Sequence, residues 1–599
     1  MVVLVYAFSR SPCVCWAKGN GWMEDRSALG LGLGHGLGGE SSDEARSELL
    51  LLSRLALASF GPGGTLQGVQ ANSESDVGTL SSVSRRIFDS LKLRTWRARA
   101  LVSLTVQPQH ETFGDGGLLA LFVAAKLMEA IERSCCSNPF DTFHVTQTLE
   151  SILDHLRGKL KVGLRVDLEE DGRSIQPIAE LRWNDLECVV ALVRAVVASK
   201  LTKVSAAEAD EADANENGGI DHICRTVAKA FVLSLPESIV PSSSSEKPQV
   251  GLIKVLGPGI TQSFTTDNLI VDIPISSQVQ QMLPLFDPSV VVVDTSLDVN
   301  TERNSQGEGG GPGNGSAGRV GLSVENGWMN GEKATMMFEL DLLLDFVKVL
   351  EEEGVSILAC QKTIHPLIKQ ELVHRKIVPI ERVSRQHIGA VAQCSNAELV
   401  SAISTKTFKS LHSHVGRLKS VQVTKLKQRL VLQLEPQLER SMQTIVLTAP
   451  HEIIMEDLAH ACRSAFVVLN CAITSPYVIP GGGCLEMLLS TMIEATLPKE
   501  MPPKKEGRLA CEILKSLAGA LRLLAEKLCE DDVYDGQGDQ DSGPSGHSLR
   551  EKDLSLDTCW KARGVGHRLL DLVVSKLAAI EFAIDAACNL SRVDEVLTC

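Results

Sequence analysis

The two ends of this chain carry helical hydrophobic periodicity, whereas its middle does not. Aliphatic residues recur at three- and four-residue steps in four segments near the ends, 118–131, 185–200, 509–528 and 569–590. The middle has short apolar runs at 355–360 and 377–383, separated by a helical stretch at 367–374. That strand, helix, strand rhythm is typical of a parallel α/β unit. The pattern predicts a multidomain α+α/β protein, with an α/β domain inserted between two halves of a helical one.

Length and composition limit the classes of function. A chain of 599 residues is too long for one core and is expected to form two to four domains. Its net charge of −15 argues against nucleic acid as a partner, because phosphate contacts need clustered Lys and Arg. The 16 cysteines are scattered without paired CxxC elements, which favours reduced thiols over disulfides or zinc. No apolar run is long enough to span a membrane, so we expect a soluble protein without membrane insertion.

Several segments interrupt the structured sequence. Residues 1–43 end in a Gly- and Leu-rich stretch without a sustained period, so we expect a disordered extension. The acidic stretch 206–219, the Gly-rich stretch 300–318 and the stretch 531–548 are expected to be solvated loops. Asn184 or Asp185 is a suitable cap for the helix that follows, since a short side-chain oxygen can accept its first free amides.

Glycine clusters at three places resemble the nucleotide-binding turns of one protein family, the group II chaperonins. Gly61-Pro62-Gly63-Gly64 resembles that family's first phosphate turn, and Gly114-Asp115-Gly116-Gly117 resembles its Gly-Asp-Gly-Thr-Thr element. Gly481-Gly482-Gly483, followed by Cys484 and Glu486, is similar to its Gly-Gly-Gly-Ala-x-Glu element. A lone glycine cluster is weak evidence, but several in family order are strong.

Two further segments carry the same resemblance. Residues 580–597 resemble the family's closing helix and strand, which places Asp571 at an acidic position of the family. Residues 361–366 and 375–383 resemble its apical domain, and His365 within them is interpreted as structural because no Cys or Ser is suitably spaced. Within the family, the likeness is to the cilia-linked McKusick–Kaufman and Bardet–Biedl branch.

The resemblance implies a chaperonin fold with a helical equatorial domain, a small intermediate domain and an inserted α/β apical domain. The expected equatorial halves are 44–165 and 473–599, with a loop at 530–560. The expected intermediate halves are 166–245, with an acidic loop at 202–219, and 436–472. The apical domain is expected at 246–435. Its Gly-rich insert 296–333 lacks helical periodicity, so we do not expect the helical lid of the family.

The sequence departs from the family where ATP hydrolysis needs charged or hydroxyl groups. The family's water-orienting Asp lies seventeen residues before the triple glycine, where this chain has Ser464. Residues 79–86 lack the family's Thr-Asn-Asp-Gly element, and Gly117 and Leu118 replace two threonines. Because losing a positioned base typically costs about 10²–10⁴ in rate, we predict no catalytic residue and turnover near background.

The remaining glycines and carboxylates predict a vestigial nucleotide site. Its members are Gly61, Pro62, Gly63, Gly114, Asp115, Gly116, Gly117, Gly481, Gly482, Gly483 and Asp571. Asp115 would bind magnesium if a nucleotide binds, and ATP with magnesium is expected to bind weakly and not to be required.

The function that the resemblance implies is protein assembly without catalysis. Its partners would be chaperonin-like proteins of the Bardet–Biedl group, cytosolic chaperonin subunits and client subunits of the Bardet–Biedl coat complex. The expected location is the cytoplasm and the centrosome or ciliary basal body. Two alternatives stay open, an active ATP-hydrolysing folding subunit of a ring and a monomeric scaffold.

Overall fold

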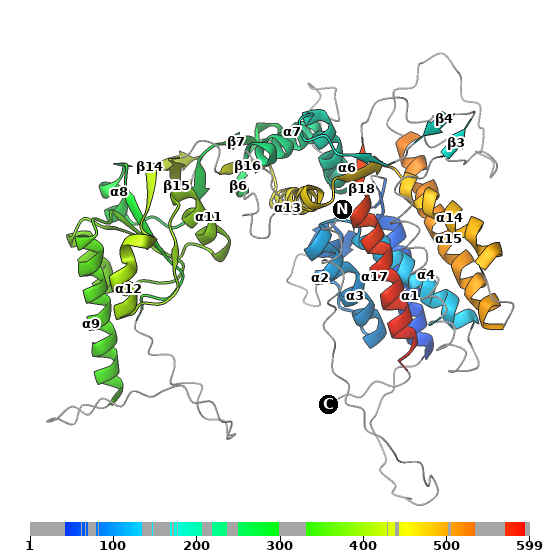
Figure 1. The fold of residues 1–599 in the computed structure, drawn as a ribbon, viewed down its shortest axis with the longest axis horizontal. Coiled ribbons are helices and arrows are strands. Elements are labelled where there is room, and N and C mark those ends of the chain that lie inside the picture. Colours follow the sequence, from blue (N-terminus) through cyan, green and yellow to red (C-terminus); the bar gives the residue numbers. More distant parts are fainter. Residues whose placement is uncertain are drawn as a thin grey trace, which may run out of the picture.

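The computed structural model describes most of the chain, with gaps. The described residues are 42–61, 63–65, 67–69, 79–81, 83–134, 147, 168–170, 173–175, 178–205, 218–235, 250–298, 331–427, 429–437, 442–500, 505–533 and 569–593. Figure 1 shows that they form an elongated molecule, with a bundle of helices at one end and a mixed lobe of sheet and helices at the other. A smaller group of helices and strands connects the two.

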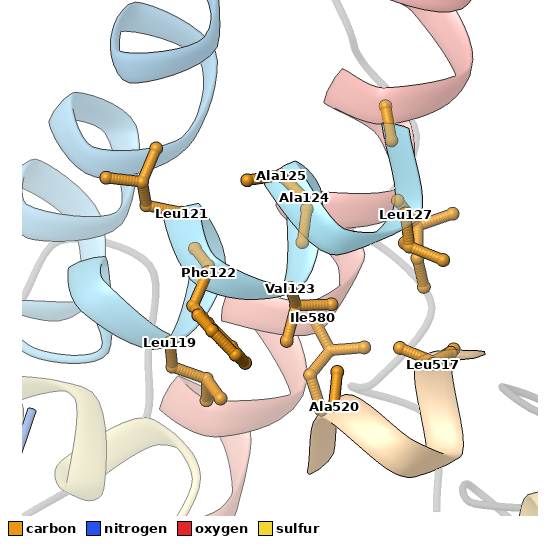
Figure 2. Packing of buried hydrophobic residues seen from close by; sticks show 14 of the residues in the cluster. Leu119, Leu121, Phe122, Val123, Ala124, Ala125, Leu127, Leu517, Ala520 and Ile580 are labelled. Carbon is orange, nitrogen blue, oxygen red and sulfur yellow. The ribbon is translucent and has the colours of Figure 1, made fainter. Parts of the chain in front are cut away.

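The bundle, which we call the helical base, joins segments from both ends of the sequence. It consists of α1 (Ser42–Ser59), α2 (Ser84–Ser90), α3 (Trp96–Phe113), α4 (Gly117–Ser134), α14 (Cys484–Glu500), α15 (Lys505–Val533) and α17 (Val573–Ser591). Helix α4 lies at its centre, because residues 119–125 are all buried and an all-apolar surface must be covered on every side. Figure 2 shows Val123 of α4 beside Ile580 of α17, with Ala520 and Leu517 of α15 on the other side of Ile580.

The connecting lobe packs three helices with a small sheet. Its helices are α6 (Leu186–Ser205), α7 (Gly218–Leu233) and α13 (Glu452–Thr474). Its strands are β6 (Val250–Leu256), β16 (Gln443–Ala449) and β7 (Phe264–Thr266), in the order β6-β16-β7. Asp185 lies directly before α6 and accepts a hydrogen bond from the Glu187 amide at 3.1 Å, so the cap predicted at this position is present.

The third lobe contains the predicted strand, helix, strand unit. Strands β10 (Ser289–Val293), β11 (Ile357–Cys360) and β12 (Val378–Ile380) are parallel neighbours, and α10 (Pro366–His374) connects the last two. The sheet continues through β14 (Gly416–Leu426), β15 (Arg429–Pro436) and β8 (Leu269–Val271), with β9 (Leu285–Phe286) and β13 (Leu399–Val400) attached. Helices α8 (Ser277–Met282), α9 (Gly331–Glu352), α11 (Arg385–Ser395) and α12 (Thr405–Ser410) accompany it.

The structural role expected for His365 is confirmed in this lobe. His365 caps α10, where its Nδ1 accepts a hydrogen bond from the Leu367 amide at 3.3 Å. The remaining short elements are the strand pairs β1 (Gln67–Val69) with β2 (Thr79–Ser81) and β3 (Leu168–Glu170) with β4 (Arg173–Ile175), and the 3-10 helices η2 (Ile260–Gln262) and η4 (Leu411–His414).

Two sequence predictions need correction at their boundaries. The helix expected over 569–590 begins only at Val573, because Leu570–Leu572 forms β18 and pairs with β17 (Tyr477–Pro480), which also pairs with β5 (Ala179–Glu180). The limits of the expected loops also differ. Helix α6 continues to Ser205, beyond the predicted loop start at 202, and α15 continues to Val533, beyond the predicted start at 530. Helix α9 starts at Gly331, before the predicted end of the insert at 333.

Other predictions fall on residues outside the described ranges. These are the N-terminal extension to residue 41, most of the three expected loops, and the closing strand after residue 593. The exact domain limits, the missing lid and the disorder of the extension therefore stay predictions. Within the described ranges, no helix combines the length and apolar character that a membrane span requires.

Candidate nucleotide site

The turn between α3 and α4 lies directly against helix α13. Gly114 ends α3 in the left-handed conformation, with φ of 76°, and its amide donates to the His110 carbonyl. A Cβ atom added at Gly114 would lie 2.5 Å from the carbonyl oxygen of Ser464 on α13. Only glycine can occupy this position, because both the backbone conformation and the neighbouring helix exclude a side chain. The backbone of Ser464 therefore lies against the turn that contains Asp115.

Asp115 is paired with a lysine that comes from the connecting lobe. The Nζ atom of Lys200 on α6 lies 3.3 Å from Asp115 Oδ1. The Lys200 side chain is 6% exposed and that of Asp115 is 36% exposed. Burial alone would raise the pKa of Asp115, but the positive charge of Lys200 holds it below its ordinary value. Asp115 is therefore an anion neutralised by the protein itself.

His110 supports this turn in its neutral form. Its Nε2 lies 2.6 Å from Ser84 Oγ, and its Nδ1 lies 3.3 Å from the Gly114 carbonyl oxygen. Burial, together with the positive charge of Lys200, lowers the pKa of His110 to about 4. A neutral imidazole adds no positive charge, so Lys200 supplies the charge that faces Asp115.

The triple-glycine turn lies against Asp571. Strand β17 leads into Gly481, and β18 runs antiparallel beside it, with Ile479 opposite Asp571. A Cβ atom at Gly481 would lie 3.4 Å from Asp571 Oδ1. Gly483 has φ of 90°, and a Cβ atom there would lie 2.7 Å from the Ala525 Cα atom of α15. The turn and Asp571, which the sequence places about 90 residues apart, therefore form one local structure.

A second buried lysine joins Asp571 to the glycine motif. Lys576 Nζ lies 2.7 Å from Asp571 Oδ2 and 2.6 Å from Glu486 Oε1. Burial raises the pKa of Asp571 despite the opposing effect of Lys576, and the carboxylates of Asp571 and Glu486 raise the pKa of Lys576. Two carboxylates thus share one ammonium group in the interior of the helical base.

The two glycine turns meet at the start of α17. Gln109 Nε2 donates to the carbonyl oxygens of Asp115 at 2.6 Å and of Ser575 at 2.8 Å. Ser575 Oγ also donates to the Asp115 carbonyl at 3.3 Å. The structure thus brings Gly114–Gly117, Gly481–Gly483 and Asp571 together.

The first glycine turn follows α1. Gly61 has φ of 79°, the Gly64 amide donates to the Gly61 carbonyl, and the Thr65 amide donates to the Ala58 carbonyl. Pro62 lies outside the described residues. The contacts described for this turn are with itself and with the end of α1, so its part in a nucleotide site stays a prediction.

The space beside the glycines is filled by the protein. Added Cβ atoms would meet Ser464 at Gly114, the Gln109 side chain at Gly116 and the His110 side chain at Gly117. We interpreted these glycines as places where a nucleotide approaches the backbone. The structure adds a second reason at Gly114, Gly116 and Gly117, since helix packing and tight turns already require residues without a Cβ atom there. Their part in nucleotide binding stays a prediction.

Helix α13 is fixed to the base by a buried carboxylate. Asp457 is fully buried and lies two turns before Ser464. It accepts hydrogen bonds from Ser81 Oγ at 2.8 Å and from the Arg86 guanidinium of α2. Cys471, nearer the end of α13, donates through Sγ to the Thr112 carbonyl at 3.2 Å.

Sequence reasoning missed the cations of this site. Lys200, Arg86 and Lys576 were not predicted, although each binds a carboxylate near the glycine turns. The available signals were a lysine inside the apolar stretch 189–201 and a lysine five residues after Asp571. A long charged side chain within an apolar helix face is usually buried only when it is paired.

The arrangement was compared with the magnesium that the resemblance implies. Mg²⁺ binds oxygen ligands at short distances in octahedral geometry. In nucleotide sites it is usually held by one or two carboxylates together with phosphate oxygens and water. Here the Asp115 carboxylate already has the Lys200 ammonium at 3.3 Å, and Gly117 and Leu118 offer no hydroxyl. In the described part of the chain, no group of three or more His, Cys, Asp or Glu side chains could hold a metal ion. This arrangement does not fit a metal ion on Asp115.

Comparison with known proteins decides the family. The model of the TCP-1/cpn60 chaperonin family matches residues 52–599. The chain belongs to the TCP-1/cpn60 chaperonin family. The resemblance that the glycine motifs indicated is thereby confirmed, and the fold is that of a divergent group II chaperonin.

The relatives agree with this family. The chain is 23% identical to molecular chaperone MKKS of Mus musculus over 503 residues. This alignment covers 80% of this chain and 78% of the relative. The human molecular chaperone MKKS is 22% identical over 497 residues, with the same coverage. Thermosome subunit alpha of Archaeoglobus fulgidus is 24% identical over 267 residues, covering 43% of this chain and 46% of the relative. The chain therefore has a chaperonin-like function, and other chaperonin-like subunits are the partners that its family suggests.

Proposed function

We propose that this chaperonin assembles protein complexes without hydrolysing ATP. The observation that supports the proposal is the place of Ser464. It lies on α13 against the Gly114 turn, where the family motif has a carboxylate that orients water. A serine hydroxyl carries no negative charge, and loss of a positioned base typically lowers the rate by about 10²–10⁴.

The charges around Ser464 support the same proposal. Two carboxylates on the elements that meet at Ser464 have cationic partners of their own, Lys200 for Asp115 and Arg86 for Asp457. An ion-paired carboxylate is a poor base, because the cation stabilises its charged form. For one of these carboxylates to orient water in the wild-type protein, its ion pair would first have to break.

The client and location are proposed from the likeness to the relatives named molecular chaperone MKKS and to the cilia-linked branch. The proposed clients are subunits of the Bardet–Biedl coat complex, assembled together with related chaperonin-like proteins and the cytosolic chaperonin. The proposed site of action is the cytoplasm and the ciliary basal body. An ATP-hydrolysing ring subunit is the alternative, because relatives of this chain include thermosome subunits.

Steady-state ATP turnover tests the proposal. We expect wild-type turnover at the background of the assay, Ser464→Asn to match it, and Ser464→Asp to exceed both because it restores a carboxylate. Substantial wild-type turnover that is unchanged in Ser464→Asn would contradict the proposal. A native pull-down from ciliated cells then tests the partners, and a species of monomer mass alone in the extract would favour the scaffold alternative.

A further inference from the structure

The ion pair between Lys200 and Asp115 is unusual because of where its two residues come from. Lys200 belongs to α6 of the connecting lobe, whereas Asp115 lies in the α3–α4 turn of the helical base. The lysine side chain is almost completely buried, and its neighbour Leu201 belongs to the hydrophobic core of the connecting lobe. The ammonium group is therefore held at Asp115 by the packing of its own helix.

The carboxylate, in contrast, can be reached from solvent. The Asp115 side chain is 36% exposed, so a small ion could approach it if the lysine were absent. With the lysine present, a divalent ion bound to Asp115 would lie within a few ångströms of a buried ammonium group. Like charges at that distance repel strongly where little water separates them. A lysine that is free to move could turn away, but Lys200 is buried.

We propose that the Lys200 ammonium is the resident counter-cation of Asp115 and excludes a divalent metal ion from it. The pair also links α6 to the turn between α3 and α4 without any ligand. The inference concerns the same site as the proposed function, but it does not require that the chain assembles a particular client. The inference is tested by metal binding, whereas the proposed function is tested by ATP turnover.

Manganese is a suitable probe, because it binds oxygen ligands and its free and bound forms are distinguished by electron paramagnetic resonance. Purified full-length chain would be titrated with MnCl₂ alone. We expect Lys200→Met to bind one Mn²⁺ ion at least tenfold more tightly than the wild type. The double variant Asp115→Asn/Lys200→Met is expected to lose that ion. Lys229→Met, which removes an exposed lysine on α7, is the matched control and should behave as the wild type.

Each outcome decides the question. Equal Mn²⁺ binding by Lys200→Met and the wild type would overturn the proposal. If Lys200→Met does not fold, the wild type is compared with Asp115→Asn, and equal binding supports the proposal whereas weaker binding by Asp115→Asn overturns it. Wild-type ATP turnover would contradict the proposed function while leaving the Mn²⁺ result unchanged.

Discussion

The pair formed by Arg86 and Asp457 allows a quantitative test of how α13 is attached to the helical base. Asp457 is fully buried on α13, and Arg86 of α2 is 19% exposed. We consider Arg86→Met, which keeps the length of the side chain but removes the guanidinium. The carboxylate then retains the hydrogen bond from Ser81, at 2.8 Å, but loses the Arg86 guanidinium.

The magnitude follows from the burial of the carboxylate. Removing one partner of a buried ion pair usually costs about 3–5 kcal/mol, because a charge is left in the interior. The remaining donor Ser81 and the partial exposure of Arg86 reduce this cost, so we expect about 2–3 kcal/mol of local stability to be lost. Since about 1.4 kcal/mol is a factor of ten, amide exchange along α13 should accelerate about 30- to 150-fold.

Hydrogen exchange followed by mass spectrometry on peptides from residues 452–474 measures this change directly. It suits a multidomain chain, for which one global free energy of unfolding is not well defined. Arg85→Met is a matched control on the same helix, because it removes a guanidinium from an exposed ion pair. The Arg85 side chain is 45% exposed, and its Nε atom lies 3.6 Å from Asp89 Oδ2. Such a surface pair contributes about 0–1 kcal/mol. Equal acceleration in both variants would refute the reasoning, and so would a cycle with Asp457→Asn that showed no coupling.

Two further predictions concern the glycine turns and their support. Burial holds the pKa of His110 at about 4, below its ordinary 6.5, so the unfolded chain takes up a proton between these pH values that the folded chain does not. The stability that depends on neutral His110 is complete above pH 6.5 and is lost as the pH falls toward 4, by about 3 kcal/mol. A pH series of thermal midpoints should therefore be flatter for His110→Gln. Gly483→Ala should lower the thermal midpoint by several degrees, because its Cβ would lie 2.7 Å from the Ala525 Cα atom, whereas Gly519→Ala on α15, with nothing within 4 Å, should raise it slightly. A midpoint for Gly483→Ala equal to that of Gly519→Ala would contradict the packing argument.

Local pattern predicted the elements of the fold, and the family resemblance predicted that the glycine turns share one site, of which the structure brings together those at 114–117 and 481–483. The parallel strands of the third lobe and helix α4 follow from apolar runs and helical periodicity, which depend on neighbours in sequence. Strand β18 was predicted as helix. Its residues alternate, since Leu570 and Leu572 are buried and Asp571 between them is less buried, which is typical of a strand. Three residues are too few for that pattern to outweigh the long helix that follows.

The pairing of charges could not be predicted in the same way. Lys200 and Asp115 are separated by some 85 residues, and which lysine reaches which carboxylate depends on how the lobes pack. The packing role of the glycines was missed for a related reason. A motif in a turn indicates close approach of something to the backbone, but whether this is a ligand or a neighbouring helix is decided by tertiary structure, as at Gly114.

The three cations of the site share one consequence for how such a chaperonin works. Arg86 joins α2 to α13, Lys200 joins α6 to the α3–α4 turn, and Lys576 joins α17 to α14 and β18. Each neutralises a carboxylate that would otherwise need a metal ion or a proton, because an isolated buried charge is too costly to keep. The contacts between the helical base and the connecting lobe thus include ion pairs made by the chain's own side chains. In a chaperonin that works without hydrolysis, as proposed above, these ion pairs would help to hold the two lobes together.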